Sequence, residues 1–196
     1  MSKGYCTRQD VENYLLITVD PSFYDQVDEW IGEVEEYIDR KTGRNFVVEI
    51  DESGDGEARK FDGSGCSKLV IDNCLEVNKV EIGVTELEEV DPLDYVLKPS
   101  NSTPKTLIQL RNAIFLRDLE NVTVTGFWGY SVTAPGDIKF AATVLVAGII
   151  NNAWSSEGEV QSESIGRYSV TYKTKDQIDD FAKVEDILKS RKKYNF

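Results

Sequence analysis

The pattern of apolar and polar residues predicts two helices near the start of the chain. Thr7 and Asp10 have the spacing of a capping box, which opens a short helix. Asp20-Pro21 is a second start signal, and Gly43 supplies a stop. Between them acidic residues occupy one helix face, and apolar residues recur at helical spacing on the other, which forms a stripe of Phe23, Val27, Trp30, Ile31, Val34 and Ile38.

The pattern changes to that of short strands after residue 44. These segments are rich in β-branched residues, and Gly, Asp, Asn, Ser and Pro separate them, which is typical of a small antiparallel sheet or barrel. The clearest segment, Val122–Thr125, alternates between apolar and polar positions, so one of its faces is buried. The predicted strands span residues 45–50, 58–62, 68–72, 75–82, 94–97, 106–110 and 121–125.

Helical patterning returns at Pro135. Residues 138–150 are apolar on nearly every side, which predicts a buried central helix over about residues 137–153. Residues 165–172 alternate like a strand, and a capping box at Thr174 opens a last amphipathic helix. The predicted fold class is α+β: residues 1–44 and 135–196 form a small helical bundle around the buried helix, and residues 45–134 form an inserted antiparallel β-sheet or barrel-like subdomain.

Composition and charge exclude several classes of function. The 196 residues are 40% hydrophobic and 29% charged, as in an ordinary globular protein, and the longest uncharged apolar stretch, residues 140–150, is too short for a membrane span. The net charge of −13 disfavours general nucleic-acid binding. The sequence contains no histidine, which removes Ser-His-Asp and Cys-His catalysis, and it contains no phosphate-binding glycine loop.

The cysteines and the first residues indicate a protein made in a reducing compartment. Cys6, Cys66 and Cys74 are odd in number and irregularly spaced, which argues against a disulfide framework and a zinc site. The first residues contain no apolar segment, so we expect no signal peptide. We therefore expect no metal and no cofactor, and an enzyme would have to use carboxylates, Lys, Tyr or an unassisted Cys.

Three motifs allow a chemical as well as a structural interpretation. Residues 51–62 nearly follow the spacing of a calcium loop, but their strand-like flanks favour an acidic hairpin tip. Phe127, Trp128 and Tyr130 could form a ligand platform in a small β-domain binding module, although a turn that covers the buried helix is favoured. Acidic pairs such as Glu35-Glu36 could serve a carboxylate-based hydrolase, but a solvated helix face is the simpler interpretation.

The end of the chain is basic, unlike the rest. The last eight residues carry four cations and no acid, so the cations repel one another and favour contact with an acidic partner. Aromatic residues between them supply apolar anchors. The candidate interface with a partner or a neighbouring subunit consists of Arg167, Tyr168, Lys189, Arg191, Lys192, Lys193, Tyr194 and Phe196.

Several stretches, in order, resemble phage head–tail connector proteins, the adaptors beneath the portal of tailed phages. They are Thr7–Leu16, Gly32–Phe46, Lys60–Gly65, Val122–Tyr130, Ala134–Lys139 and Ser162–Tyr172. The resemblance implies a non-enzymatic virion protein of the head–tail neck, made in the host cytoplasm. It also implies a ring, usually of twelve subunits, between the portal and a stopper or tail-completion protein, through which genomic DNA passes during packaging, retention and ejection.

Overall fold

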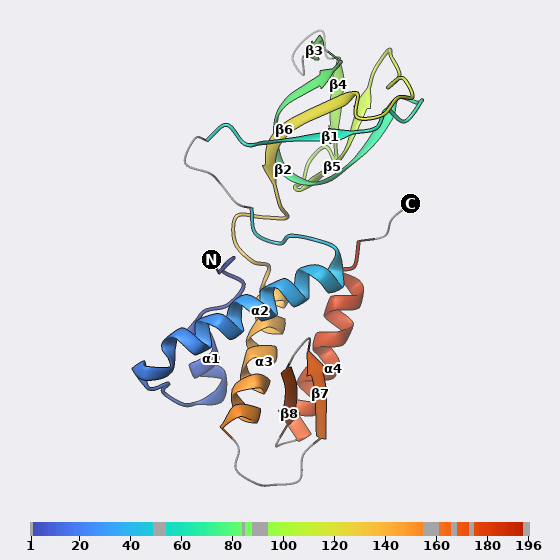
Figure 1. The fold of residues 1–196 in the computed structure, drawn as a ribbon. Helices are drawn as coiled ribbons and strands as arrows, with labels where there is room; N and C mark the ends of the chain where they lie inside the picture. The colour runs from blue at the N-terminus through green and yellow to red at the C-terminus, as the bar shows by residue number, and fades with distance from the viewer. Residues whose placement is uncertain are drawn as a thin grey trace. The chain divides into compact units, whose positions relative to one another are not determined.

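The chain forms two compact units. The computed structural model describes residues 2–48, 54–83, 85–87, 94–154, 161–165, 168–172 and 175–193. One unit, called here the helical unit, consists of Met1–Phe46 and Thr133–Phe196, and the other, the β unit, is Val47–Val132. The described residues form four α-helices and an open antiparallel sheet, which confirms the α+β class (Figure 1).

The start signals in the sequence open the first two helices. At α1 (Arg8–Leu15), the Thr7 side chain accepts the backbone N–H of Asp10, and the Asp10 side chain accepts that of Thr7. Asp20 caps a 3₁₀ turn (Pro21–Phe23) that leads into α2 (Tyr24–Thr42). Gly43 ends α2 in the left-handed conformation, φ 66°, which favours glycine.

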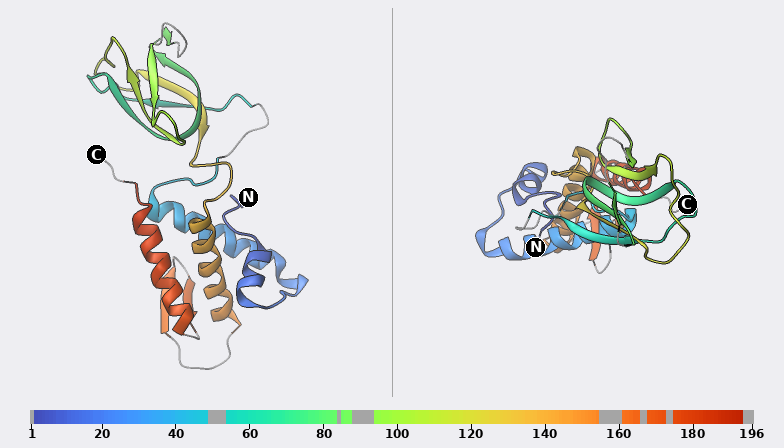
Figure 2. Two further views of the ribbon diagram at one scale, coloured as in Figure 1. Left: turned by 180° about the vertical axis from the view of Figure 1, so that it is seen from behind. Right: turned by 90° about the horizontal axis from the view of Figure 1, so that it is seen from above.

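The third helix forms the centre of the helical unit. Every residue of α3 (Gly136–Ala153) from Ala141 to Ile150 is buried, because α1, α2 and α4 (Lys175–Ser190) and strand β8 (Tyr168–Tyr172) all pack against it. Figure 2 shows α3 between α1 and α4. The predicted core residues of these helices are all at most 6% exposed: Trp30, Ile31, Val34, Ile38, Val144, Leu145, Ile149, Phe181 and Leu188.

The strand predicted at residues 165–172 is instead part of a hairpin. β7 (Gln161–Ile165) pairs antiparallel with β8, and Ile165 lies opposite Tyr168. The prediction missed β7 because its polar residues, Gln161 to Ser164, show no apolar alternation.

The sheet of the β unit has the strand order β1-β6-β2-β5-β4, with β3 paired to β2, and all its pairs are antiparallel. The path ends on two different strands, β1 and β4, so the sheet is open. Its buried core includes Tyr95, Ile108, Phe115 and Trp128. The strands are β1 (Glu57–Phe61), β2 (Lys68–Ile82), β3 (Thr85–Leu87), β4 (Tyr95–Lys98), β5 (Lys105–Leu110) and β6 (Val122–Trp128).

Two strand predictions were wrong. Residues 68–72 and 75–82 form one strand, β2, because Cys74 pairs with Lys105 of β5 and with Trp128 of β6 and so carries the chain from one partner to the other. Register irregularities on either side of Cys74 absorb the polar residues that resembled a turn. Of residues 45–50, Val47 makes only an isolated bridge to Ser131, and residues 49 and 50 lie outside the described residues.

Two glycines in the resemblance motifs lie where no side chain fits. A Cβ at Gly63 would overlap the carbonyl oxygen of Leu116, and a Cβ at Gly126 would overlap that of Glu76. These close approaches bring the β1–β2 turn against the segment between β5 and β6, and β6 against β2.

Candidate functional site

The predicted interface is built on the C-terminal end of α4. Phe181, Val184 and Leu188 bury one face of this helix in the helical unit. Lys189 and Lys192 follow that face and are exposed, the Lys189 side chain by 72%. The Nζ of Lys189 lies 3.9 Å from a carboxylate oxygen of Glu185, one turn earlier, which at such exposure is a weak ion pair.

Arg191 has an acidic partner within the subunit, contrary to the expectation that the basic tail has no acid nearby, and the backbone of Lys193 is also bonded within the subunit. Arg191 Nε lies 2.8 Å from an oxygen of Asp137, in the first turn of α3. The backbone N–H of Lys193 donates to the carbonyl of Thr42, at the end of α2, over 2.6 Å. The end of α4 therefore closes the helical unit where α2 ends and α3 begins.

The structure places only part of the remaining candidate set. Tyr168 is the first residue of β8. Arg167, Tyr194 and Phe196 lie outside the described residues. The partner interface as a whole therefore stays a prediction.

The opposite end of the chain is anchored by a carboxylate that the sequence analysis placed on a solvated helix face. Glu35 is 1% exposed, so the interpretation of Glu35-Glu36 as a solvated pair was wrong for Glu35, although Glu36 is exposed. One Glu35 oxygen accepts the Tyr5 N–H over 2.8 Å and the Ser2 hydroxyl over 3.0 Å, and the other accepts the Lys3 N–H over 2.6 Å. Its position, four residues after the buried Ile31 of α2, is the signal that could have placed it in the interior.

A second carboxylate on the same side of α2 completes this anchor. Asp39 accepts the Tyr5 hydroxyl and forms an ion pair with Lys3 over 2.6 Å. The Tyr5 hydroxyl in turn accepts the N–H of Phe46 over 2.9 Å. Burial raises the pKa of Asp39 and that of Tyr5, so the hydroxyl stays protonated and donates at neutral pH.

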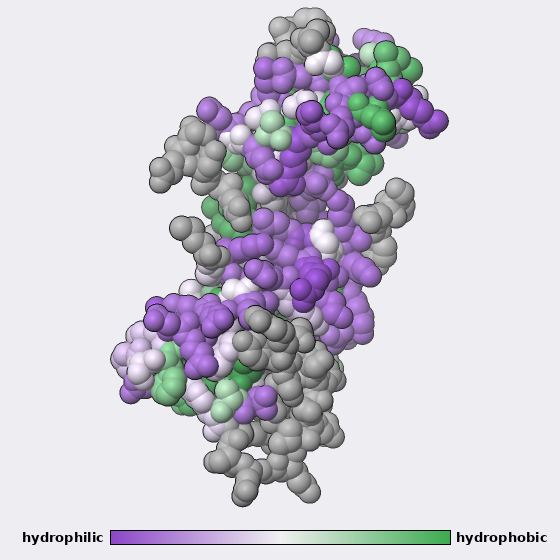
Figure 3. Space-filling model, viewed as in Figure 1, coloured by the Kyte–Doolittle hydropathy of each residue, from purple (hydrophilic) through white to green (hydrophobic). Residues whose placement is uncertain are grey.

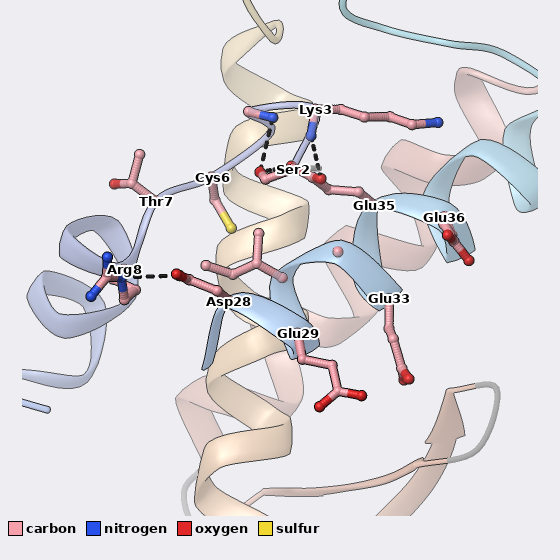
Figure 4. Close-up of a pocket in the computed structure, with 13 residues that line it drawn as sticks. Ser2, Lys3, Cys6, Thr7, Arg8, Asp28, Glu29, Glu33, Glu35 and Glu36 are labelled. Carbon is pink, nitrogen blue, oxygen red and sulfur yellow. Dashed lines mark hydrogen bonds and ion pairs between the residues drawn. The ribbon is translucent and has the colours of Figure 1, made fainter. Parts of the chain in front are cut away.

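A groove of about 790 Å³ runs between residues 2–8 and α2 (Figure 4). Arg8 closes one end through an ion pair with Asp28 over 3.0 Å. The rest of its charged lining is mostly acidic, with Lys3 as the other cation, and comprises Glu29, Glu33, Glu35 and Glu36. Cys6 also lines the groove, and burial raises the pKa of its thiol to about 12, so it is protonated and a poor nucleophile.

The structure also bears on the two alternative binding sites, the aromatic platform at Trp128 and the acidic tip at residues 51–62. Trp128 is 5% exposed, its indole N–H donates to the carbonyl of Glu57 over 2.7 Å, and Arg59 covers its ring at 4.7 Å, so it offers no stacking platform. Of the acidic tip from Asp51 to Asp62, the first three residues, Asp51, Glu52 and Ser53, lie outside the described residues. Asp62 itself accepts the backbone N–H of Glu120 over 2.8 Å. Elsewhere in the described part of the chain, no three acidic or cysteine side chains converge as a metal site would require.

No described helix combines the length and apolar character needed to cross a bilayer.

The fold is similar to that of chains from gene transfer agent (GTA) particles, although no protein family model and no curated sequence matches the chain. The neck of the empty particle, computed with C6 symmetry, contains a chain matched at a TM-score of 0.55 and 9% identity, over 96% of this chain and 89% of that one. A chain from the neck of the native particle, computed with C12 symmetry, matches at a TM-score of 0.53 and 10% identity, over 96% of this chain and 88% of that one. A chain from the virion of the native particle matches at a TM-score of 0.54 and 10% identity, over 96% of this chain and 89% of that one. At such identity the likeness shows a common fold along nearly the whole chain.

Proposed function

We propose that this chain is a structural, non-enzymatic component of the neck of a tailed-phage-like particle. The observation that carries the proposal is the likeness of 96% of the chain to chains from the necks of GTA particles. The ordered motifs that resemble head–tail connectors support it independently, because the comparison of folds at 9–10% identity owes little to shared sequence. Within the neck, we assign the chain the role of the connector that docks beneath the portal.

The charge of the protein suits a conduit for DNA. The exposed face of α2 carries Asp25, Asp28, Glu29 and Glu36, and the whole chain carries a net −13. Negative walls do not hold a phosphate backbone, so DNA can pass without sequence-specific binding. No described feature favours the ligand-binding module or the carboxylate hydrolase over this role.

The proposed assembly is a homo-oligomeric ring, twelve-fold in the connector family, between the portal and a stopper or tail-completion protein. Subunits of net charge −13 repel one another at low ionic strength. We therefore expect the isolated protein to be monomeric or a small oligomer in low salt and to form rings on the portal. Stable rings of the isolated protein in low salt, detected by mass photometry, would contradict this.

The proposed docking element for the portal is the C-terminal segment, residues 165–196. Lys189 and Lys192 supply exposed positive charge, and Tyr194 and Phe196 supply apolar anchors. Because Arg191 and Lys193 hold the helical unit together, deletion of the whole tail would confuse binding with folding. The informative changes are therefore Lys189→Glu with Lys192→Glu, and truncation after Lys193.

The role in the neck is tested by assembling particles without this protein. We expect DNA-filled heads that fail to join tails, and tailed particles with an intact neck would refute the proposal. For the docking element, portal binding is measured by co-sedimentation. Both tail variants should lose binding, whereas the control Lys68→Glu with Lys98→Glu, which changes the net charge equally in the β unit, should retain it. Unchanged binding by both tail variants would move the docking surface elsewhere.

A further inference from the structure

Exposed apolar side chains gather in two places on the described surface. Of the nine large apolar side chains that are exposed, seven fall into two groups, whereas scattered single ones would need no explanation. The first group, the apolar tip, belongs to the helical unit and consists of Leu16, Ile17, Phe23 and Trp154. The second, the loop patch, lies between β5 and β6 of the β unit and consists of Ile114, Leu116 and Leu119.

The apolar tip is held in an unfavourable conformation for a leucine. Leu16 follows α1 with φ 56°, the left-handed position that glycine or asparagine usually occupies, yet its side chain is 90% exposed. Phe23 and Trp154, from the start of α2 and the end of α3, lie with ring centroids 5.5 Å apart and are 42% and 40% exposed. Figure 3 shows apolar side chains on the surface where α1 meets α2. Nothing inside the described part of the helical unit accounts for a leucine at this position.

The loop patch stands on a rigid base. Phe115, between two of its members, is fully buried, and its backbone bonds to Cys66 and Gly65 over 2.9 and 2.8 Å. The Asn121 side chain donates to the carbonyl of Leu116 over 3.0 Å. The segment is thus fixed while Leu116 and Leu119 remain 66% and 79% exposed. A preorganised apolar loop loses little conformational entropy when it binds.

The charges beside the two groups are complementary. The exposed side chains of Asp20 and Asp25 flank Phe23 in the apolar tip. The exposed side chains of Arg111 and Arg117 flank the loop patch. Two acidic residues also adjoin the loop patch: Asp118, which is exposed and lies between Leu116 and Leu119, and Glu120, which forms an ion pair with Lys60 over 3.5 Å. Arg111, Arg117 and Lys60 together exceed these two acids by one positive charge. An apolar tip flanked by two acidic residues and a loop patch with one positive charge in excess are complementary in sign as well as in apolar character.

We propose that the apolar tip of one copy receives the loop patch of the next copy. Two different surfaces on one chain make a heterologous contact, which propagates from copy to copy and closes into a ring when the rotation allows. The inference rests on the proposed function for the closure of the ring, and it names the surfaces that join its subunits. Leu116 and Leu119 of one copy bury against Phe23 and Leu16 of its neighbour.

Complementation between two defective variants tests this contact. The tip variant is Leu16→Asn with Phe23→Ser, in which asparagine suits the left-handed backbone, and the loop variant is Leu116→Ser with Leu119→Ser. Analytical ultracentrifugation in high salt, which screens the net charge, measures association. We expect each variant alone to associate at least about tenfold more weakly than the wild type. An equal mixture should form dimers and nothing larger, because each pair retains one intact contact and two ineffective ends.

Crosslinking reports the same contact directly. Cys66 lies beside Phe115 and is exposed, whereas Cys6 and Cys74 are buried. In a Ser22→Cys variant, a bismaleimide should join the introduced thiol of the tip to Cys66 of another copy. The control Val70→Ser with Val132→Ser removes two exposed apolar side chains outside both groups, and its association should match that of the wild type.

Several outcomes would overturn the inference. The inference is wrong if both variants associate as strongly as the wild type, or if their mixture does not form dimers. It is also wrong if the wild type stays monomeric in high salt, or if crosslinks form only between two tips or between two loops. Each result is independent of the proposed function, which is judged by the loss of head–tail joining. Particles that need this protein but assemble normally with both variants would retain the proposed function and refute the tip-to-loop contact.

Discussion

Glu35 offers the sharpest test of how the helical unit is held together. Its carboxylate is 1% exposed and accepts three donors from the first five residues: Ser2, Lys3 and Tyr5. Glu35→Gln keeps the size of the side chain but replaces one acceptor oxygen with an NH₂ donor. Whichever way the amide is oriented, at least one backbone N–H then faces another donor.

The cost follows from the hydrogen bonds that are lost. A hydrogen bond to a charged acceptor contributes about 1.5–3 kcal/mol, and leaving a buried donor unsatisfied costs a similar amount. We therefore expect Glu35→Gln to destabilise the helical unit by about 2–3 kcal/mol, because the substitution also removes the desolvation cost of the charge. For a unit of this size that lowers the melting temperature by about 6–15 °C.

Far-UV circular dichroism follows the melting of the helices, and hydrogen exchange of residues 2–6 reports release of the N-terminal segment. The matched control is Glu36→Gln, one residue along α2, where the side chain is exposed and the change should stay within about 0.5 kcal/mol. Equal melting temperatures for the two variants, or unchanged protection of the Tyr5 amide, would refute the account of Glu35 as an anchor.

Three further predictions follow from the packing and from the titrating groups. Leu145→Ala should cost about 2–5 kcal/mol, because the side chain is fully buried, whereas Val132→Ala, at an exposed site, should be near neutral in urea titration. Burial raises the pKa of Asp39, so the folded state keeps this proton to higher pH than the unfolded chain. The stability of the wild type minus that of Asp39→Asn should therefore fall as pH rises from the ordinary range of carboxylates through the raised pKa, and a flat difference would contradict this. Intact-mass analysis after brief maleimide treatment of the folded protein should show a single label, on Cys66, because burial raises the pKa of the other two thiols to about 12 and 11; more than one label would contradict the burial.

Local signals in the sequence predicted the helices well. The reciprocal cap of Thr7 and Asp10 needs only residues three apart, and the stripe of α2 needs only its own spacing. The apolar run of α3 predicted burial because a helix without a polar face has no side that is favourably exposed to water. The likeness to neck chains agrees with the family resemblance that the motifs indicated.

The contacts that the sequence did not reveal join distant residues. Arg191 pairs with Asp137 from 54 positions away, and no periodic pattern reports such a pair. Glu35 was hidden because acidic residues surround it on α2, and only the N-terminal segment that packs over it makes its burial favourable. The length of β2 was hidden for the same reason, since the change of partner at Cys74 depends on strands that come later in the chain.

The charge and the apolar surfaces of this protein act over different ranges, and together they favour assembly on a template. At physiological ionic strength the repulsion between subunits of charge −13 is screened beyond about 8 Å, so it opposes approach but vanishes quickly with distance. The apolar tip and the loop patch act only at contact, and each contains three or four side chains, which makes a single pairing weak. In the proposed assembly, a portal that binds the C-terminal segment of each subunit would place neighbours at high effective concentration, and a weak contact would then be sufficient. Ring formation would be confined to the neck by this balance, because at physiological ionic strength the remaining repulsion makes the contact too weak to assemble rings from free subunits, whereas high salt removes that repulsion.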